Sequence, residues 1–183
     1  MKQRVRGFTL IELMVSIGIL AILVAVAIPS FTSVMVNYRL TSIANTFVAS
    51  AQLARSEAIK RNGRVTMCKS ADGVTCTVSG SWNQGWILFH DVDNNAAKGT
   101  TEAIIHRESA MPVNYLTMRP GGGVEDHYIS FTASGGSELI SGAFQATTVT
   151  LCSQVEPIGQ ARQMVLNSVG RLRVQKTTVS ICT

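Results

Sequence analysis

The feature that most constrains this chain is an apolar run near its N-terminus. Residues 8–28 read FTLIELMVSIGILAILVAVAI, and as a helix they would extend about 31 Å, close to the hydrocarbon thickness of a bilayer. Lys2, Arg4 and Arg6 precede the run, which predicts that the N-terminus stays on the cytoplasmic side. A cleaved secretory signal fits poorly, because the run is too long and no A-x-A-like site follows it cleanly. A simple membrane anchor leaves Glu12 unexplained, since a carboxylate in lipid is rare unless it has a partner.

The helical pattern continues past the apolar run. Pro29 ends the run, and a proline inside a helix removes one hydrogen bond and favours a kink or local melting. Beyond it, an amphipathic segment predicts one helix from about Phe8 to Lys60, roughly 80 Å long, with Gly63 as its cap. Its covered face is predicted from a 3.6-residue period to contain Phe31, Val34, Tyr38, Phe47, Ala51, Ala54 and Ala58.

After Gly63 the pattern changes to alternation with β-branched residues, which predicts strands. We expect them over 64–69, 75–79, 85–90, 103–108, 115–119, 128–132, 144–153, 162–167 and 171–176. Gly-rich turns separate several of them, including residues 120–123, 134–137 and Gly170. The predicted fold is α+β, with an antiparallel sheet or small sandwich packed on the second half of the long helix.

Composition and cysteines indicate a folded, exported domain. Hydrophobic residues make up 46% and charged residues 15%, which excludes a disordered chain. Three of the 16 basic residues precede the apolar run, leaving 13 against 11 acids, so the net charge is no general argument for nucleic acid. Two disulfides are the expected state of Cys68, Cys76, Cys152 and Cys182. A Cys68–Cys76 bond would close a short hairpin and a Cys152–Cys182 bond would pin the C-terminus, but the sequence leaves the other two pairings open.

The segment Arg6-Gly7-Phe8-Thr9-Leu10-Ile11-Glu12 resembles the class III signal of type IV pilins and type II secretion pseudopilins. The resemblance implies a prepilin peptidase that cuts between Gly7 and Phe8 and methylates the new Phe8 amine. Glu12 would then offer its carboxylate to the Phe8 amine of a neighbouring subunit, since each charge alone in lipid is costly. We therefore expect Glu12 to favour one axial register between neighbouring subunits during assembly.

The rest of the chain carries a second, narrower resemblance. The segments at 54–68, 82–91, 129–136 and 168–174, which read ARSEAIKRNGRVTMC, WNQGWILFHD, ISFTASGG and SVGRLRV, resemble the GspH/FimT group of minor pilins and pseudopilins. The resemblance implies a type IV pilin fold and a low-copy subunit at or near a filament tip, in a complex that primes assembly. The implied partners are other major and minor pilins, the prepilin peptidase and, before assembly, the inner membrane.

These features divide the chain into four parts. We expect a cleaved leader at 1–7, a transmembrane and filament-core helix at 8–28, the amphipathic half of that helix at 29–62 and a β-rich globular domain at 63–183. The expected location is the bacterial inner membrane, with one span and a periplasmic C-terminal domain, and later the pilus. A minor pseudopilin of type II secretion is the alternative. The four cysteines, the pinned C-terminus and the basic C-terminal segment favour the pilus.

That basic segment is Gly170-Arg171-Leu172-Arg173. On a strand, Arg171 and Arg173 would point to one face and Leu172 to the core. Adjacent guanidinium groups bind phosphates, and a GRxR sequence in this region resembles that of DNA-binding FimT-like pilins. Double-stranded DNA is thus a candidate partner of Gly170, Arg171, Arg173 and Lys176. The alternative is a solvated edge strand whose charges discourage aggregation.

Two further groups of residues are interpreted as structural. Asp91, Asp93, Asn95 and Glu102 fall at positions 1, 3, 5 and 12 of a calcium loop. Ala96 replaces the glycine at position 6, so we interpret residues 91–102 as a polar loop and predict no metal and no cofactor. The histidines, His90, His106 and His127, are scattered and form no nucleophile or metal set, and we predict a structural subunit, not an enzyme.

Overall fold

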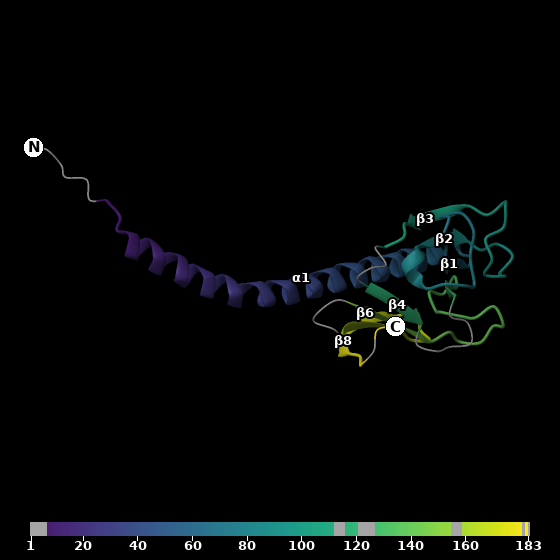
Figure 1. Cartoon of the computed structure of the whole chain (residues 1–183). Coiled ribbons are helices and arrows are strands. Elements are labelled where there is room, and N and C mark those ends of the chain that lie inside the picture. Colours follow the sequence, from purple (N-terminus) through teal and green to yellow (C-terminus); the bar gives the residue numbers. More distant parts are fainter. Residues whose placement is uncertain (1–6, 112–115, 121–126, 155–158, 181, 183) are drawn as a thin grey trace, which may run out of the picture.

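The computed structural model describes residues 7–111, 116–120, 127–154, 159–180 and 182, so the basic leader residues and the glycine run 121–123 lie outside the described residues. One helix, α1 (Leu10–Arg61), accounts for 52 residues and measures about 78 Å. Its backbone stays helical across Pro29, and the helix curves gently along its length (Figure 1). The first half projects away from the globular domain, and the second half lies against it.

α1 ends in a left-handed cap at Asn62, not at Gly63. Asn62 has φ 49° and ψ 40°, and its N–H donates to the Ile59 carbonyl at 3.2 Å. The Gly63 N–H donates to the Ala58 carbonyl at 3.1 Å. These two bonds make a Schellman motif, with Asn62 as the left-handed residue. Gly63 packs closely on His90, since a Cβ there would lie 2.8 Å from the His90 Nε2 and the imidazole would have to shift.

The covered face of α1 agrees with the prediction only in its second half. Its buried apolar residues are Val36, Leu40, Ala44, Phe47, Ala51, Ala54 and Ala58. Phe31, Val34 and Tyr38 were predicted on this face, but they are 68%, 61% and 73% exposed. The reason is the nine-residue step from Tyr38 to Phe47, which turns a helix by two and a half turns and so reaches the opposite side.

Two antiparallel four-stranded sheets cover that face of α1. The first has the order β3-β2-β1-β5, built from β1 (Val65–Lys69), β2 (Trp86–His90), β3 (Ile104–Glu108) and β5 (Tyr128–Phe131). The second has the order β4-β6-β7-β8, built from β4 (Leu116–Pro120), β6 (Thr147–Ser153), β7 (Gln160–Leu166) and β8 (Leu172–Thr178). The strands lie beside the second half of α1 in Figure 1, which confirms the α+β architecture.

Aromatic side chains fill the junction between α1 and the first sheet. Phe47 meets Trp82 and Trp86 edge-on, with ring centroids 5.2 Å and 5.3 Å away. Trp82 lies in a short 3-10 helix, η1 (Trp82–Gln84), directly before β2. Both tryptophans are buried, so neither offers a face on which a nucleic-acid base could stack. They anchor the sheet to the helix.

The disulfides are Cys68–Cys76 and Cys152–Cys182. The predicted strand at 75–79 is wrong, because residues 70–81 form a loop of bends. Asp72 accepts backbone hydrogen bonds from Val74 at 2.7 Å and Thr75 at 2.8 Å, which turns the chain before a ladder can form. The buried Lys69 then holds the end of the loop, donating to the carbonyls of residues 78 and 80 at 3.0 Å and 2.9 Å.

Candidate functional site

The peptide bond between Gly7 and Phe8 lies in a non-helical segment just ahead of α1. Both residues are exposed, Phe8 to 71%. No atom lies within 4 Å of a Cβ placed on Gly7. α1 begins at Leu10, two residues beyond this bond. A peptidase would therefore meet an accessible, non-helical backbone, which a bond inside a helix would not offer.

Thr9 and Glu12 form the first turn of α1. Thr9 is the N-cap, and its Oγ1 accepts a hydrogen bond from the Glu12 N–H at 3.3 Å. An acid at the third helical position also lies near the positive end of the helix dipole. The T-x-x-E pattern of a capping box was readable in the sequence, and it gives Thr9 a role that the pilin motif alone does not assign. Glu12 remains exposed and lies four residues from Phe8.

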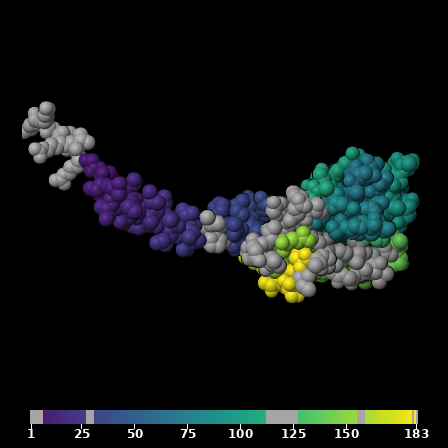
Figure 2. Space-filling view, viewed as in Figure 1, coloured from purple at the N-terminus to yellow at the C-terminus, as the bar shows by residue number. Residues whose placement is uncertain are grey.

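The first half of α1 is apolar and uncovered, and it stands clear of the globular domain in the space-filling view (Figure 2). From Leu10 to Val26 every residue is exposed, and this helix is long and apolar enough to cross a membrane, with a mean hydropathy of 2.7 in its most apolar window. In water this surface would be unstable as a monomer. It requires either lipid or other helices around it.

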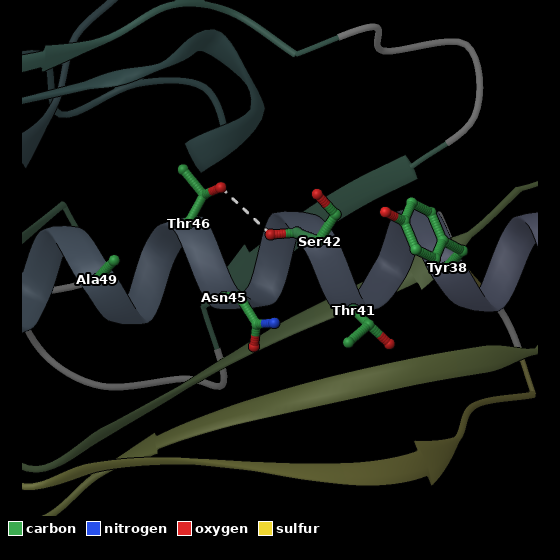
Figure 3. A pocket seen from close by; sticks show the side chains of 6 residues that line it. All are labelled: Tyr38, Thr41, Ser42, Asn45, Thr46 and Ala49. Atoms are coloured by element: carbon green, nitrogen blue, oxygen red, sulfur yellow. Dashed lines mark hydrogen bonds between the residues drawn. The ribbon is translucent and has the colours of Figure 1, made fainter.

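A shallow hollow of about 430 Å³ lies along the second half of α1. Its lining consists of Tyr38, Thr41, Ser42, Asn45, Thr46 and Ala49. Figure 3 shows these side chains projecting from successive turns, with the Thr46 hydroxyl donating to the Ser42 carbonyl at 3.2 Å. Beyond Tyr38 they are short. The outer surface of α1 therefore changes from large apolar to small polar side chains along its length.

Arg171 and Arg173 lie together at the edge of the second sheet. Both are exposed, and with Val165 and Asn167 they line an open pocket of about 370 Å³. Leu172 between them is 7% exposed, as the alternation predicted. β8 is the last strand in the sheet order. Among the described residues, neither guanidinium forms a salt bridge.

Gly170 precedes this pair for a structural reason. Its φ is +75°, and a Cβ there would lie 2.2 Å from the carbonyl oxygen of Gly135. The β7–β8 turn therefore packs against the turn that follows β5, backbone on backbone. Gly170 is buried and sets the position of Arg171 without offering a group to a ligand.

Lys176 lies on the other face of β8. It has the same strand parity as Leu172, and it shares an open pocket with Asn37, Arg162 and Gln160. Arg162 is 5% exposed, and its Nη2 donates to the Oδ1 of Asn37 at 3.2 Å. The structure thus brings Arg171 and Arg173 together and separates Lys176 from them. Sequence reasoning missed Arg162 as a group that docks the second sheet on α1.

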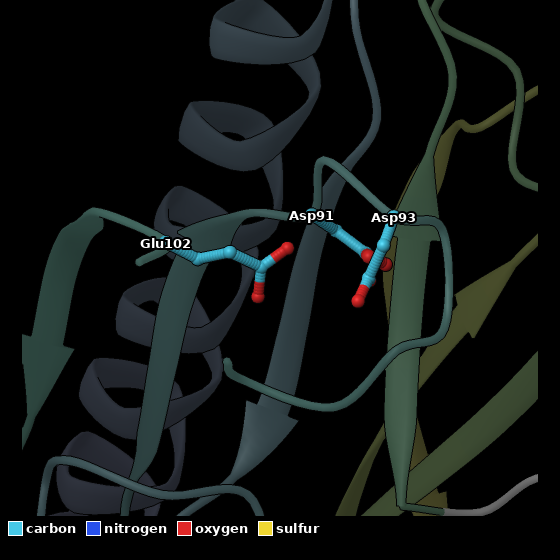
Figure 4. Close-up of side chains that lie close together, drawn as sticks. All are labelled: Asp91, Asp93 and Glu102. Atoms are coloured by element: carbon cyan, nitrogen blue, oxygen red, sulfur yellow. The ribbon is translucent and has the colours of Figure 1, made fainter. Parts of the chain in front are cut away.

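The acidic side chains of the loop at residues 91–102 lie close together, but two of them accept hydrogen bonds from the loop's own backbone. Ligand oxygens of Asp91, Asp93 and Glu102 lie within 4.8 Å of one another (Figure 4). Asp91 accepts hydrogen bonds from the backbone N–H groups of Asn95 and Ala96, both at 3.0 Å. Glu102 accepts them from the N–H groups of residues 92 and 99, at 2.7 Å and 2.8 Å. Burial raises the pKa of Asp91. Asp91 and Glu102 thus hold the backbone of this loop through four hydrogen bonds.

No catalytic constellation is evident in the described part of the chain. His106 lies 3.5 Å from Glu108 at the surface, and neither belongs to a cluster with a nucleophile. His90 packs near Gly63 at the end of α1. General acid–base or nucleophilic catalysis needs convergent groups around a reacting atom, and these residues do not converge.

Comparisons with known proteins match two parts of the chain to family models and one stretch to a curated relative. The family described as "Type II transport protein GspH" matches residues 44–170, and the "Prokaryotic N-terminal methylation motif" matches residues 2–28. Prepilin peptidase-dependent protein D of Escherichia coli (strain K12) is 41% identical over 69 residues. That match covers 38% of this chain and 47% of the relative, so the chain spans less than half of that protein's length.

Solved structures share the fold. The type IV minor pilin FimU of Pseudomonas aeruginosa has a TM-score of 0.59 at 19% identity, over 80% of this chain and 97% of FimU. The minor pseudopilin EpsH of the Vibrio cholerae type 2 secretion system has a TM-score of 0.51 at 11% identity, over 75% and 96% of the two chains. At these identities the likeness concerns the fold alone.

Proposed function

The chain belongs to the GspH family, and from that premise we propose that it is a minor pilin of the type IV pilus, a low-copy subunit at or near the tip that supports pilus assembly. Its family and structural neighbours are structural subunits, and a minor pilin or pseudopilin role follows from them. The observation that carries the proposal is the N-terminal arrangement. An exposed Gly7–Phe8 bond stands directly ahead of a 52-residue helix whose apolar first half the domain leaves bare.

The first step is processing of the membrane-anchored chain. A prepilin peptidase cuts between Gly7 and Phe8 and methylates the new Phe8 amine, and the N-terminal methylation motif supports this step. Before assembly, the apolar half of α1 spans the inner membrane and the globular domain lies in the periplasm. The three basic leader residues, on the cytoplasmic side, favour that orientation.

The second step is transfer into the filament. The bare half of α1 exchanges lipid for the helices of other pilins, so no apolar surface meets water in either state. Glu12 of one subunit then pairs with the Phe8 amine of another, which offsets the cost of holding either charge in an apolar core. Glu12 and Phe8 are both exposed, so each is open to a neighbour.

A minor pseudopilin of type II secretion is the second candidate. The family description and the likeness to EpsH favour it. The exposed arginine pair at the start of β8 favours the pilus. A deletion strain separates the two. Loss of surface pili by electron microscopy with normal protein secretion supports the minor pilin, and retained pili with blocked secretion overturns it.

DNA uptake is a further part of the proposal, supported by the exposed pair Arg171 and Arg173. Two adjacent guanidinium groups on an edge strand present a phosphate-binding surface to a duplex. Gel shifts with the full chain at several salt concentrations test it. The Arg171→Gln/Arg173→Gln variant is expected to lower the slope of log affinity against log salt by about two. A matched Lys60→Gln/Arg61→Gln variant, at the end of α1, controls for net charge. Equal slopes for wild type and the β8 variant would sink the idea.

A further inference from the structure

Arg162 is a buried cation whose recorded partners are all neutral. It is 5% exposed. Its Nη1 donates to the Ala161 carbonyl at 3.0 Å, and its Nη2 donates to the Oδ1 of Asn37 at 3.2 Å and the Oγ1 of Thr41 at 3.3 Å. No carboxylate forms a salt bridge with it within the described ranges. Buried charges are normally paired, because removing an ion from water is costly. The charge of this guanidinium is therefore not neutralised by any described acidic group.

The surrounding sequence contains few acids that could supply the missing charge. Between Glu12 and Glu57 the chain has no Asp or Glu, and residues 139–183 contain only Glu156, which lies outside the described residues. These two stretches include nearly all of α1 and strands β6, β7 and β8. A partner anion from these elements, apart from Glu156, is thus excluded by composition.

Lys176 adds a second cation at the same place. Arg162 on β7 and Lys176 on β8 are directly paired across the sheet. Both line an open pocket of about 420 Å³, together with Asn37, Gln160 and two threonines of β8. Lys176 is exposed. We refer to this feature, lined by Asn37, Gln160, Arg162, Lys176, Thr177 and Thr178, as the Arg162 pocket. Two positive charges around one open cavity attract a phosphate group.

The Arg162 pocket lies close to the end of the membrane span. Asn37 follows Ile28 by nine residues, about 14 Å along the helix axis, and Gln160 reaches further back, donating to the Oγ of Ser33 at 3.4 Å. β8 occupies the end of the domain from which the bare half of α1 projects (Figure 1). From Leu13 to Tyr38 the helix has no charged residue, and an exposed Tyr38 followed by Arg39 is typical of a membrane interface. The headgroup layer extends roughly 5–8 Å beyond the hydrocarbon. Ser33 lies about 7.5 Å beyond Ile28 along the helix axis, so the Gln160 end of the pocket is at headgroup depth, and long Lys and Arg side chains reach toward that layer.

We propose that the Arg162 pocket binds the phosphate of an anionic phospholipid in the leaflet next to the globular domain. Arg162 supplies a preorganised guanidinium, and Lys176 supplies a second charge from the rim. The bound headgroup holds the domain against the membrane until the subunit enters the filament. The inference rests on the membrane-anchored stage of the proposed function. It concerns the opposite face of β8 from Arg171 and Arg173, so it is independent of DNA binding.

Native mass spectrometry of the full chain in neutral detergent tests the site, with phosphatidylglycerol or phosphatidylcholine added. The wild type is expected to retain phosphatidylglycerol preferentially, and Arg162→Met/Lys176→Gln to bind it roughly thirtyfold more weakly. Arg171→Gln/Arg173→Gln removes the same number of positive charges from the same sheet edge, on its other face, and is expected to bind like wild type. Equal binding by the two double variants overturns the proposal.

Three further experiments test whether the bound phosphate comes from a lipid headgroup and whether the chain is anchored in a membrane. Lys176→Gln alone changes an exposed residue, so it can be measured even if Arg162→Met does not fold. Unchanged lipid retention by Lys176→Gln then counts against the pocket. Inorganic phosphate or a short DNA duplex that displaces the lipid at equal concentration overturns the assignment to a headgroup. If the chain enters phosphatidylglycerol nanodiscs but keeps no bound lipid when it is released from them in the mass spectrometer, this inference alone is refuted. A chain that does not enter nanodiscs refutes the membrane stage of the proposed function as well.

Discussion

Replacing Gly170 by alanine should destabilise the globular domain while leaving every charged group in place. A left-handed φ of +75° costs a non-glycine residue roughly 1–2 kcal/mol. The added Cβ would also lie 2.2 Å from the carbonyl oxygen of Gly135 and 3.3 Å from the backbone carbon of Gly136. These are backbone atoms, so no rotamer change relieves the overlap, and shifting a packed segment costs about 1–3 kcal/mol more.

The expected total is about 3 kcal/mol, which lowers the melting temperature of a chain of this size by roughly 10 °C. Near-ultraviolet circular dichroism of the full chain in detergent, with both disulfides intact, reports the buried tryptophans during melting. Gly142→Ala is the matched control, because Gly142 has φ +84° and open space around its Cβ position. That variant should lose only about 1 kcal/mol. Equal losses in the two variants would refute the packing argument and leave only backbone strain.

Three other predictions follow from the same structure. Phe47→Ala should destabilise the domain by about 3–5 kcal/mol, because it empties the centre of the tryptophan cluster, while Phe31→Ala at the exposed face should cost the isolated chain little; denaturant unfolding measures both. Glu12→Gln should still be cleaved and methylated, but it should not enter filaments made with wild-type pilins, which mass spectrometry and immunoblots of sheared pili detect; normal incorporation would contradict it. Carboxyl-carbon NMR titration should place the pKa of Asp72 below 3.8, because four hydrogen bonds stabilise its charge, and that of Asp91 above 3.8, because burial penalises its charge. Asp72 then stabilises the fold above pH 3.8 and loses this contribution as the pH falls below it, whereas the contribution of Asp91 is greatest below pH 3.8 and is lost as the pH rises through its raised pKa.

The features that the sequence predicted well are those set by local chemistry. The apolar run, the basic residues before it and the change from a 3.6-residue to a two-residue period each depend on neighbours along the chain. They predicted α1 to within two residues at its start and one at its end. The sequence also suggested the Cys68–Cys76 bond, between residues eight apart, but it left the other pairings open. Local patterns therefore specify the helix, the change of secondary structure and the processing motif.

The errors arose where burial depends on a tertiary contact or on a break in the helical period. Phe31 and Val34 were assigned to the covered face from a 3.6-residue period, but the nine-residue step from Tyr38 to Phe47 breaks that period, and Phe31 and Val34 are exposed. Strand alternation grouped Arg171 with Arg173 correctly. The same rule, applied to Lys176, places it with Leu172 on the other face. Arg162 carries no local sign of burial, since its partners Asn37 and Thr41 are more than a hundred residues away.

The absence of acids from residues 13–56 also bears on Glu12. In the proposed filament of packed helices, the new Phe8 amine of one subunit would lie beside the α1 of another, and residues 13–56 of this chain, 44 in all, contain no other carboxylate that could pair with it. A shift of the helix by one turn, about 5.4 Å, would leave both the amine and Glu12 unpaired in an apolar environment. A wrong register is therefore destabilised by two unpaired charges at once. An acid elsewhere in this stretch would provide an alternative register and weaken the discrimination, so introducing one at Ser16 should reduce the fraction of correctly assembled subunits even with Glu12 intact.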